Sequence, residues 1–200
     1  MVIGIILAAG ASSRMGQSKA LLPIGGDSFV SRLSRTFLAG GVDELIIVAG
    51  ADMEAIREAV SDVGRPVRVI ENPRREDGQL SSLLVGLTAA DRPGTEAVLL
   101  GLVDVPMVTP ATVGAVVGAF RRSRAPIVRP VRGARHGHPV LFGREVFADL
   151  RGADPALGAK AVIRARITQI VDVPIDDDGA FEDVDTPEAY ARLIDSASGT

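Results

Sequence analysis

The chain has 200 residues, of which 46% are hydrophobic and only 4% aromatic, and its formal net charge is −3. This length fits one domain spanning residues 1–200, and the small negative charge gives no electrostatic case for nucleic-acid binding. The sequence contains no cysteine, which excludes disulfides, zinc–thiolate sites and thiol catalysis.

The apolar N-terminus, residues 1–10, has to be distinguished from a targeting or membrane-spanning segment. It has no basic leader, and its apolar run is short of the ~20 residues that a membrane span needs. Polar Ser12 and Ser13 follow at once. We therefore expect a buried first strand in a cytoplasmic protein that has neither a membrane nor a nucleic-acid partner.

Apolar runs and helical spacings alternate along the rest of the chain. Short apolar runs predict buried strands at Val2–Leu7, Glu44–Ala49, Pro66–Ile70, Ala97–Val103, Ile127–Val131, Pro139–Phe142 and Ile167–Val173. Helical spacing and capping residues predict helices at Ser28–Leu38, Asp52–Val60, Leu80–Ala90, Thr109–Phe120, from Asp154–Pro155 onward, and Pro187–Ile194. The alternation predicts a single-domain, three-layer α/β sandwich with a mainly parallel central sheet and helices on both faces. Ligands of such sheets bind beyond the carboxyl ends of the strands, so the loops there are the candidate sites.

The loop after the first strand combines small residues with two cations. It reads Leu7-Ala8-Ala9-Gly10-Ala11-Ser12-Ser13-Arg14-Met15-Gly16-Gln17-Ser18-Lys19. Small residues let backbone N–H groups approach phosphate oxygens, Arg14 offers a planar fork and Lys19 a mobile charge. The Walker A loop is excluded because five residues, not four, separate the glycines, and the dinucleotide fingerprint is excluded because two of its glycines are absent. The loop therefore predicts a triphosphate site.

Residues Leu7–Lys19 resemble the signature L-A-x-G-x-S-x-R-M-G-x-x-K of a nucleotidyltransferase family. That family includes molybdenum cofactor cytidylyltransferases and molybdopterin guanine-dinucleotide synthases. The resemblance implies a nucleotide-diphospho-sugar transferase-like fold and Mg²⁺-dependent transfer of a nucleoside monophosphate to a phosphorylated acceptor. It makes Arg14 and Lys19 the phosphate-binding cations. The other nucleotide-binding residues that it implies in this loop are Leu7, Ala8, Ala9, Gly10 and Ser12.

Two acidic segments supply candidate metal ligands. Asp104 follows the fourth strand, where a carboxylate can hold Mg²⁺ against phosphates, although Asp-x-Pro alone is common in turns and helix caps. Given its position in the chain relative to the first motif, Asp104 resembles the metal-binding aspartate of the family. Val103 stands before it where many relatives have glycine. The segment 181–188 predicts a helix start and resembles the family's D-x-D-T-P-E segment, which implies Asp183 and Asp185 as further ligands. Asp183 is preferred because Asp185 is well placed to cap the helix.

The acidic run 176–179 is expected to be a solvated turn.

In the third loop, Gly78 permits close backbone approach, and Ser82 lies near a predicted helix N-terminus with unpaired N–H donors. A simply capped helix is the alternative interpretation of this loop. The family carries a similar Gly-x-x-x-Ser pattern after its third strand, so the resemblance adds Gly78 and Ser82 to the nucleotide-binding residues.

The loop 129–139 carries three arginines and two histidines. A transition-metal pair is disfavoured because the sequence contains no cysteine and no other histidine. The positive charge favours an anionic acceptor site over the alternative of a solvated hairpin loop. Gly137–Pro139 resembles the Gly-His-Pro segment that lines the acceptor pocket of molybdenum cofactor cytidylyltransferases. Arg135, His136 and His138 are therefore the candidate acceptor-binding residues.

Together these motifs predict a nucleotidyltransferase with Arg14, Lys19 and Asp104 as catalytic residues and pyrophosphate as leaving group. CTP is favoured because the methyl group of Ala9 would crowd a purine more than a pyrimidine. The resemblance implies molybdopterin cofactor as acceptor and a molybdoenzyme that receives the product. Two alternatives stay open: GTP as donor with the same acceptor, and transfer to another phosphorylated metabolite. A non-catalytic accessory protein that binds nucleotide or cofactor is a third. A dehydrogenase is weakened by the missing dinucleotide fingerprint.

Overall fold

The structure of the chain, a computed structural model, describes residues 1–10, 17–64 and 66–198. The strands are β1 (Val2–Ala8), β2 (Pro23–Ile24), β3 (Asp27–Ser28), β4 (Glu44–Ala49), β5 (Val67–Glu71), β6 (Ala97–Leu102), β7 (Ile127–Arg132), β8 (Arg135–His136), β9 (Val140–Gly143) and β10 (Ile170–Pro174). The main sheet has the order β10-β7-β9-β6-β1-β4-β5, with β8 paired to β7, and β2 and β3 form a small separate sheet. In the main sheet only β8 and β9 run antiparallel to their neighbours. The mainly parallel sheet predicted from the sequence is confirmed.

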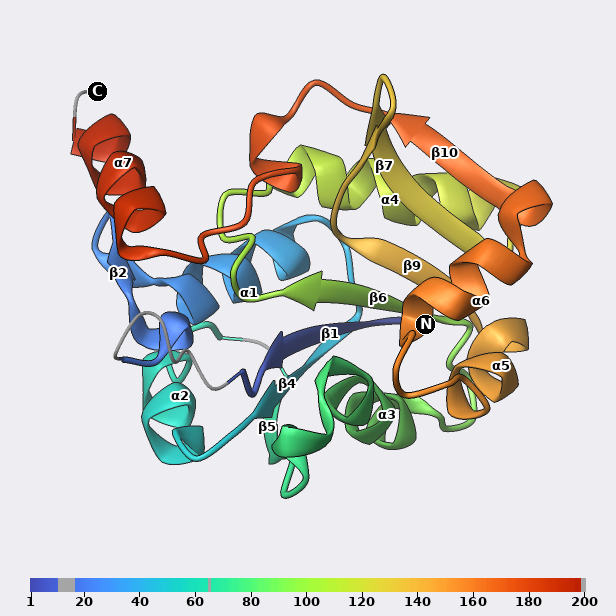
Figure 1. The fold of residues 1–200 in the computed structure, drawn as a ribbon, viewed down its shortest axis with the longest axis horizontal. Helices are drawn as coiled ribbons and strands as arrows, with labels where there is room; N and C mark the ends of the chain where they lie inside the picture. Colours follow the sequence, from blue (N-terminus) through green and yellow to red (C-terminus); the bar gives the residue numbers. More distant parts are fainter. Residues whose placement is uncertain (11–16, 65, 199–200) are drawn as a thin grey trace.

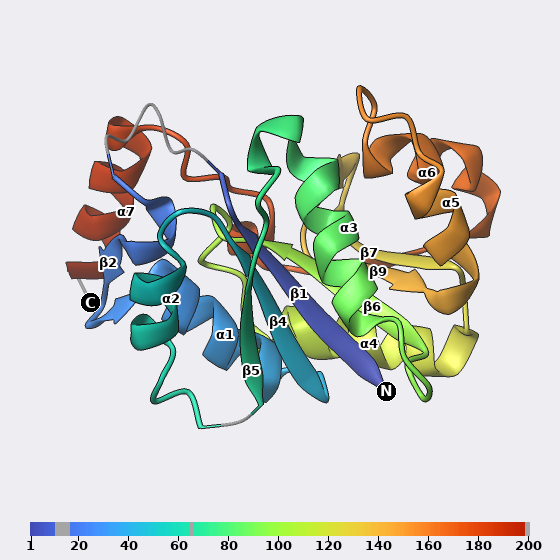
Figure 2. The same cartoon turned by 90° about the horizontal axis from the view of Figure 1, so that it is seen from below.

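Helices cover both faces of this sheet (Figure 1). One face carries α1 (Phe29–Ala39), α2 (Met53–Ala59), α4 (Pro110–Ser123) and, at its margin, α7 (Pro187–Ser198). Figure 2 shows the other face, where α3 (Gln79–Ala90) crosses the strands and α5 (Phe147–Arg151) and α6 (Ala159–Ala165) lie beside it. Short 3₁₀ helices span Lys19–Leu21, Arg75–Asp77, Arg144–Val146, Ile167–Gln169 and Asp178–Ala180. Of the helices in the described part of the chain, none is long and apolar enough to cross a membrane.

The first strand shows why an apolar run without alternation forms a strand here. Successive side chains of a strand point to opposite faces of the sheet. Ile3 and Ile5 therefore join the hydrophobic cluster beneath α3 and α5, whereas Val2 and Ile6 join the cluster beneath α1 and α4. Both faces of β1 are buried, and the three-layer sandwich predicted from the sequence is confirmed.

The helix predicted to open at Asp154–Pro155 begins later, at Ala159. The Asp154 carboxylate accepts a hydrogen bond from Ala156 N at 2.8 Å, and its carbonyl accepts from Leu157 N and Gly158 N. These bonds close a turn that ends at Gly158, whose φ of 60° interrupts the helical path. The predicted strand Ile167–Val173 likewise starts late, because its first three residues form a 3₁₀ turn.

The acidic run 176–179 is only in part the solvated turn that we expected, because Asp176 and Asp178 are exposed but Asp177 is half-buried. Asp177 accepts hydrogen bonds from Thr109 and Thr112 in the first turn of α4. The contacts of Asp177 were not predicted because its two partners are 65 and 68 residues away along the chain. No local pattern in the sequence indicates such a contact.

We predict that Gly101→Ala destabilises the fold. A Cβ atom at Gly101 would lie 2.4 Å from Cζ of Phe37, which is fully buried. Because a close-packed ring cannot retreat, the free energy of unfolding should fall by about 1–3 kcal/mol, measured by urea unfolding followed by circular dichroism. Gly114→Ala is the matched control: its Cβ would meet only a carbonyl oxygen at 3.6 Å, and alanine favours a helix by roughly 0.5–1 kcal/mol. Equal stability of the two variants would contradict this packing.

Candidate functional site

A cavity of about 290 Å³ lies beyond the carboxyl ends of β1 and β6. These strands are parallel neighbours with Leu7 opposite Leu102, and their arrowheads point to the same side of the molecule (Figure 1). The loops that follow them therefore meet. The cavity is lined by Leu7, Ala8, Ala9, Gly10, Lys19, Ala20, Arg75, Gly78, Gln79, Ser82, Leu102, Val103 and Asp104.

The cavity brings together every described residue that the sequence analysis placed in the nucleotide site, and Asp104 with them. Two further predicted residues, Ser12 and Arg14, lie outside the described residues. Lys19 is the third residue after this gap and the first of a 3₁₀ helix. Residues 7–10 and Lys19 thus line the same cavity as Asp104.

The third loop is shaped by Asn72, whose side chain is fully buried. Its Nδ2 donates to Oγ of Ser81 at 2.8 Å and of Ser82 at 2.9 Å, and its Oδ1 accepts from Arg74 N at 2.9 Å. The Ser81 hydroxyl lies 2.9 Å from the carbonyl oxygens of Arg74 and Gly78, to which it donates. Ser81 therefore has a structural role at the start of α3, whereas Gly78 and Ser82 line the cavity.

Sequence reasoning did not select Arg75 and Gln79, which also line the cavity. A Cβ atom at Gly50 would lie 3.1 Å from Cδ of Arg75 and 3.2 Å from the carbonyl oxygen of Ala9. Gly50 thus allows the Arg75 stem to lie close to the first loop. In the sequence, only the position of Arg75 in the charged third loop could have indicated that it lies at the site.

Asp104 is largely buried, and its Oδ1 has no hydrogen-bond partner among the described residues. Burial raises the pKa of this carboxyl from 3.8 to about 6; Lys19 opposes the rise, and Asp183 and Asp185 add to it. The Lys19 Nζ lies 3.8 Å from Asp104 Oδ2 and forms a short ion pair with Asp185. An unpaired, buried carboxylate oxygen next to two further carboxylates fits a divalent cation.

Within the described residues, no three His, Cys, Asp or Glu side chains are grouped closely enough to hold a metal by themselves. Proteins hold Mg²⁺ through one or two carboxylates while substrate phosphates supply further oxygens. The cavity that Asp104 lines also contains Lys19 and the backbone of the first loop. The residues present therefore fit a cation that arrives with a triphosphate.

The second acidic segment lies beside Asp104 because Val184 N donates to the Asp104 carbonyl at 2.7 Å. Thr186 caps α7: its Oγ1 accepts from Ala189 N at 3.2 Å. Asp185 pairs with Lys19 instead of capping the helix, so the reason given for preferring Asp183 over Asp185 was wrong. Asp183 acts electrostatically on both Asp104 and His138.

A second cavity, of about 700 Å³, shares Leu7 and Gln79 with the first. It contains His136 and His138 of the predicted acceptor site but not Arg135. The cations that line it are Arg129, which belongs to the basic loop, and Lys160 and Arg164, which sequence reasoning did not select. Much of its remaining lining is apolar, namely Leu80, Leu83, Leu100, Val140, Phe142, Leu157, Ile163 and Ile167.

The arginines of the basic loop do not converge as expected. Arg135 stacks on the Phe181 ring at 5.1 Å and donates to the Phe181 carbonyl at 2.9 Å. Arg132 forms ion pairs with acidic residues that follow β10. Arg129 is buried and its Nε donates to Asp172 at 2.7 Å, while its side chain reaches the second cavity.

His138 lines the second cavity and is within electrostatic reach of Asp183 in the second acidic segment. Burial lowers the pKa of its imidazole below 6.5, with Asp183 and the Leu100 backbone opposing this effect and Lys160 adding to it. The ring is therefore neutral at pH 7. Its Nδ1 has no hydrogen-bond partner among the described residues.

Residues 4–171 match the family of MobA-like NTP transferase domains. The chain belongs to this family. The family predicted from the motif at Leu7–Lys19 is confirmed, and so is the nucleotide-diphospho-sugar transferase-like fold.

Three known proteins show how members of the family vary. The chain is 33% identical to nicotine blue oxidoreductase of Paenarthrobacter nicotinovorans, with 96% of each chain covered. It is 29% identical to a probable molybdenum cofactor guanylyltransferase of Opitutus terrae, with 65% of this chain and 61% of the relative covered. The structure of Rv0371C of Mycobacterium tuberculosis H37Rv in complex with manganese has a TM-score of 0.74 at 28% identity, with 98% of each chain covered.

We predict that Asp104→Asn stabilises the metal-free protein at neutral pH. Because the pKa of Asp104 rises from 3.8 to about 6 on folding, the folded chain binds this proton more tightly than the unfolded chain. The free energy of unfolding therefore falls as the pH rises through the window from 3.8 to about 6, by at most roughly 3 kcal/mol. Asparagine carries no charge, so the free energy of unfolding of the variant does not fall over this pH window for this reason.

The measurement is urea unfolding in EDTA at pH 4 and pH 7.5. The difference in stability between variant and wild type should be larger at pH 7.5. The lowered pKa of His138 has the opposite pH dependence, but it is present in both proteins and largely cancels in the difference. A difference that does not change with pH would contradict the burial of a charged Asp104.

Proposed function

We propose that the protein transfers a nucleoside monophosphate from a nucleoside triphosphate to a phosphorylated acceptor and releases pyrophosphate. The observation that carries this proposal is the cavity in which Lys19 and the backbone of residues 7–10 face the buried carboxylate of Asp104. A phosphate oxygen of the acceptor attacks the α-phosphorus, and the bond to the leaving pyrophosphate breaks. No protein nucleophile is needed, because positioning and electrostatic stabilisation carry the catalysis.

In this proposal Lys19 and Arg14 neutralise the triphosphate, and Leu7, Ala8, Ala9, Gly10, Ser12, Gly78 and Ser82 enclose the nucleotide. Asp104, with Asp183 or Asp185, would hold Mg²⁺. When bound, the metal supplies positive charge at the phosphate oxygens. The manganese complex of Rv0371C supports a divalent cation in proteins of this fold.

The base is proposed to be cytosine, on the steric argument that the Ala9 methyl group lines the cavity. The similarity to a probable molybdenum cofactor guanylyltransferase favours guanine instead. Molybdopterin cofactor is the proposed acceptor in either case, with a molybdoenzyme as recipient of the product. It would occupy the second cavity beside His136 and His138, where Arg129, Lys160 and Arg164 offer positive charge to an anionic group. Arg135 would act at the rim of that cavity, from its place over Phe181.

The test is pyrophosphate release with Mg²⁺ and molybdopterin cofactor, comparing CTP, GTP, ATP and UTP. We expect CTP to react, and Asp104→Ala to reduce kcat by on the order of 100-fold or more because the charge opposite the phosphates is lost. A preference for GTP would leave the reaction intact and refute the steric argument from Ala9. Metal-dependent nucleotide binding without turnover would point to a different acceptor.

Two other functions are outcomes of the same test. A non-catalytic accessory protein would bind nucleotide without metal and would tolerate Asp104→Ala. An oxidoreductase is favoured by one specific observation, the 33% identity over 96% of the chain to nicotine blue oxidoreductase. Tight binding of NADH or NADPH, together with no pyrophosphate release from any triphosphate, would favour that function.

We predict that Lys19→Met has opposite effects on metal and nucleotide. Lys19 pairs with Asp185 and lies 3.8 Å from Asp104, so its charge competes with a cation for these carboxylates. Without nucleotide, Mn²⁺ measured by electron paramagnetic resonance should bind several-fold more tightly. The KM for the triphosphate should rise on the order of 10- to 100-fold, because a charge-assisted contact to phosphate is lost.

Lys160→Met is the matched control, because Lys160 is the other lysine of the chain and lines the second cavity. It should leave Mn²⁺ binding unchanged and raise the KM for the acceptor. Weaker Mn²⁺ binding in Lys19→Met would show that the lysine does not compete with the metal.

A further inference from the structure

The carboxylate of Asp177 accepts four hydrogen bonds from outside its own residue. Oδ2 accepts from Thr109 N at 2.9 Å, from Thr109 Oγ1 at 2.8 Å and from Thr112 Oγ1 at 2.6 Å, and Oδ1 accepts from Gly179 N at 3.1 Å. Its neighbours differ: Asp176 and Asp178 are exposed and pair with Arg132. Asp177 is thus tied to the start of α4, whereas Asp176 and Asp178 are tied to Arg132 at the end of β7.

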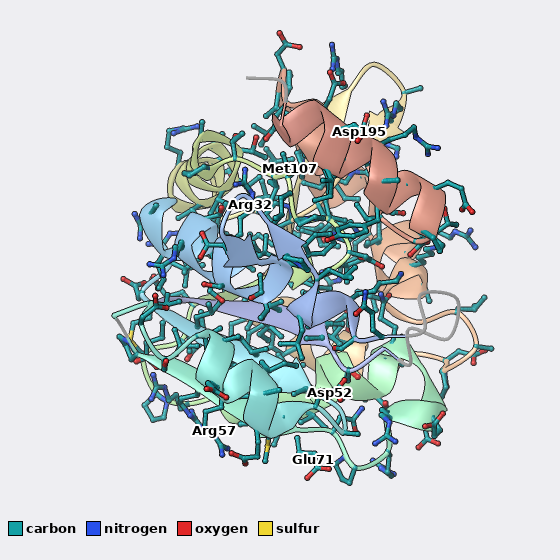
Figure 3. The ribbon with its side chains drawn as sticks, turned by 90° about the vertical axis from the view of Figure 1, so that its left-hand side faces the viewer. Arg32, Asp52, Arg57, Glu71, Met107 and Asp195 are labelled. Carbon is teal, nitrogen blue, oxygen red and sulfur yellow. The ribbon has the colours of Figure 1, made fainter. Side chains whose placement is uncertain are left out.

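The partners of Asp177 belong to the segment that follows Asp104. Thr109 is the N-cap of α4, and the loop between Asp104 and Thr109 is held by Arg32 of α1, whose Nε donates to the Pro106 carbonyl at 3.2 Å. Figure 3 shows Arg32 and Met107 close together on this side of the molecule, near α7. A Cβ atom at Gly179 would lie 2.3 Å from the Met107 carbonyl oxygen, so the chain after Asp177 lies directly on this loop.

The same segment is held again further along. The Ala180 carbonyl accepts from His138 N at 2.8 Å, and Val184 N donates to the Asp104 carbonyl at 2.7 Å. Ala180 and Val184 are both buried. We call residues 177–185 the acidic strap: it is fixed by Asp177 at one end and by Val184 at the other, and it carries Asp183 and Asp185 on either side of Val184.

We propose that Asp177 is a positioning residue that holds the acidic strap against Asp104 and so raises the affinity for the metal–nucleotide complex. The proposal rests on the metal site of the proposed function. Asp177 does not reach the first cavity and acts only through the strap. With the anchor in place, Asp183 and Asp185 are already near Asp104; without it, ordering the strap would oppose metal binding.

The chemistry of the anchor requires a carboxylate. Two hydroxyl groups and two backbone N–H groups donate to its two oxygens, and a helix N-terminus favours negative charge. Asparagine has the same shape but only one acceptor oxygen, and its amide group would face donors. Asp177→Asn therefore removes the negative charge and at least one of the four hydrogen bonds, with little change in volume.

The test is Mn²⁺ binding, followed by electron paramagnetic resonance, with α,β-methylene analogues of CTP and GTP present. We expect Mn²⁺ to bind on the order of 10-fold more weakly to Asp177→Asn than to the wild type. Pyrophosphate release should recover the wild-type kcat at saturating Mg²⁺, with only the metal activation constant raised. The matched control is Asp176→Asn, whose side chain is 92% exposed and should leave both constants unchanged.

A lower melting temperature of Asp177→Asn with unchanged Mn²⁺ affinity would overturn the proposal, because Asp177 would then only stabilise the start of α4. If that variant does not fold, Thr112→Val removes one of the four donors and should weaken Mn²⁺ binding a few-fold; unchanged affinity overturns the proposal equally. Absence of turnover with every triphosphate would refute the proposed function. Because Mn²⁺ binding needs no turnover, the effect of Asp177 is measured separately from that outcome.

Discussion

Leu7 of β1 lies opposite Leu102 of β6 in parallel register, and the two strands end at the same edge of the sheet. The small residues after β1 and Asp104 after β6 therefore line one cavity. Each strand is buried on both faces, which holds this register, because a shift by one residue would turn every side chain toward the other helix layer. The proposed chemistry depends on this arrangement of backbone more than on any single side chain.

Charge at this edge is balanced across the cavity. Partial burial raises the pKa of Asp104 to about 6, while Lys19 lies 3.8 Å from its Oδ2 and pairs with Asp185. A triphosphate with its cation would satisfy both sides, since the phosphates attract Lys19 and the metal attracts the carboxylates.

Two polar side chains shape the loops around the cavity: the buried Asn72 and the half-buried Asp177. Asn72 holds Ser81 and Ser82 at the start of α3, and Asp177 holds the acidic strap on the start of α4. Buried polar groups that are fully hydrogen-bonded fix a unique geometry, whereas apolar packing alone tolerates alternatives. The edge of the sheet that lines the first cavity is thus supported by side chains that do not line the cavity themselves.

The sequence by itself determined the strand and helix alternation, the parallel sheet and the residues of the first loop, because apolar periodicity and short motifs are local properties. It also placed Asp104 at the correct strand end. Only the tertiary structure decided that Asp177 is an anchor, that Arg75 lines the first cavity, and that Asp185 pairs with Lys19, 166 residues away. Such contacts join segments distant in sequence, and they form only when the packed sheet and helices bring those segments together.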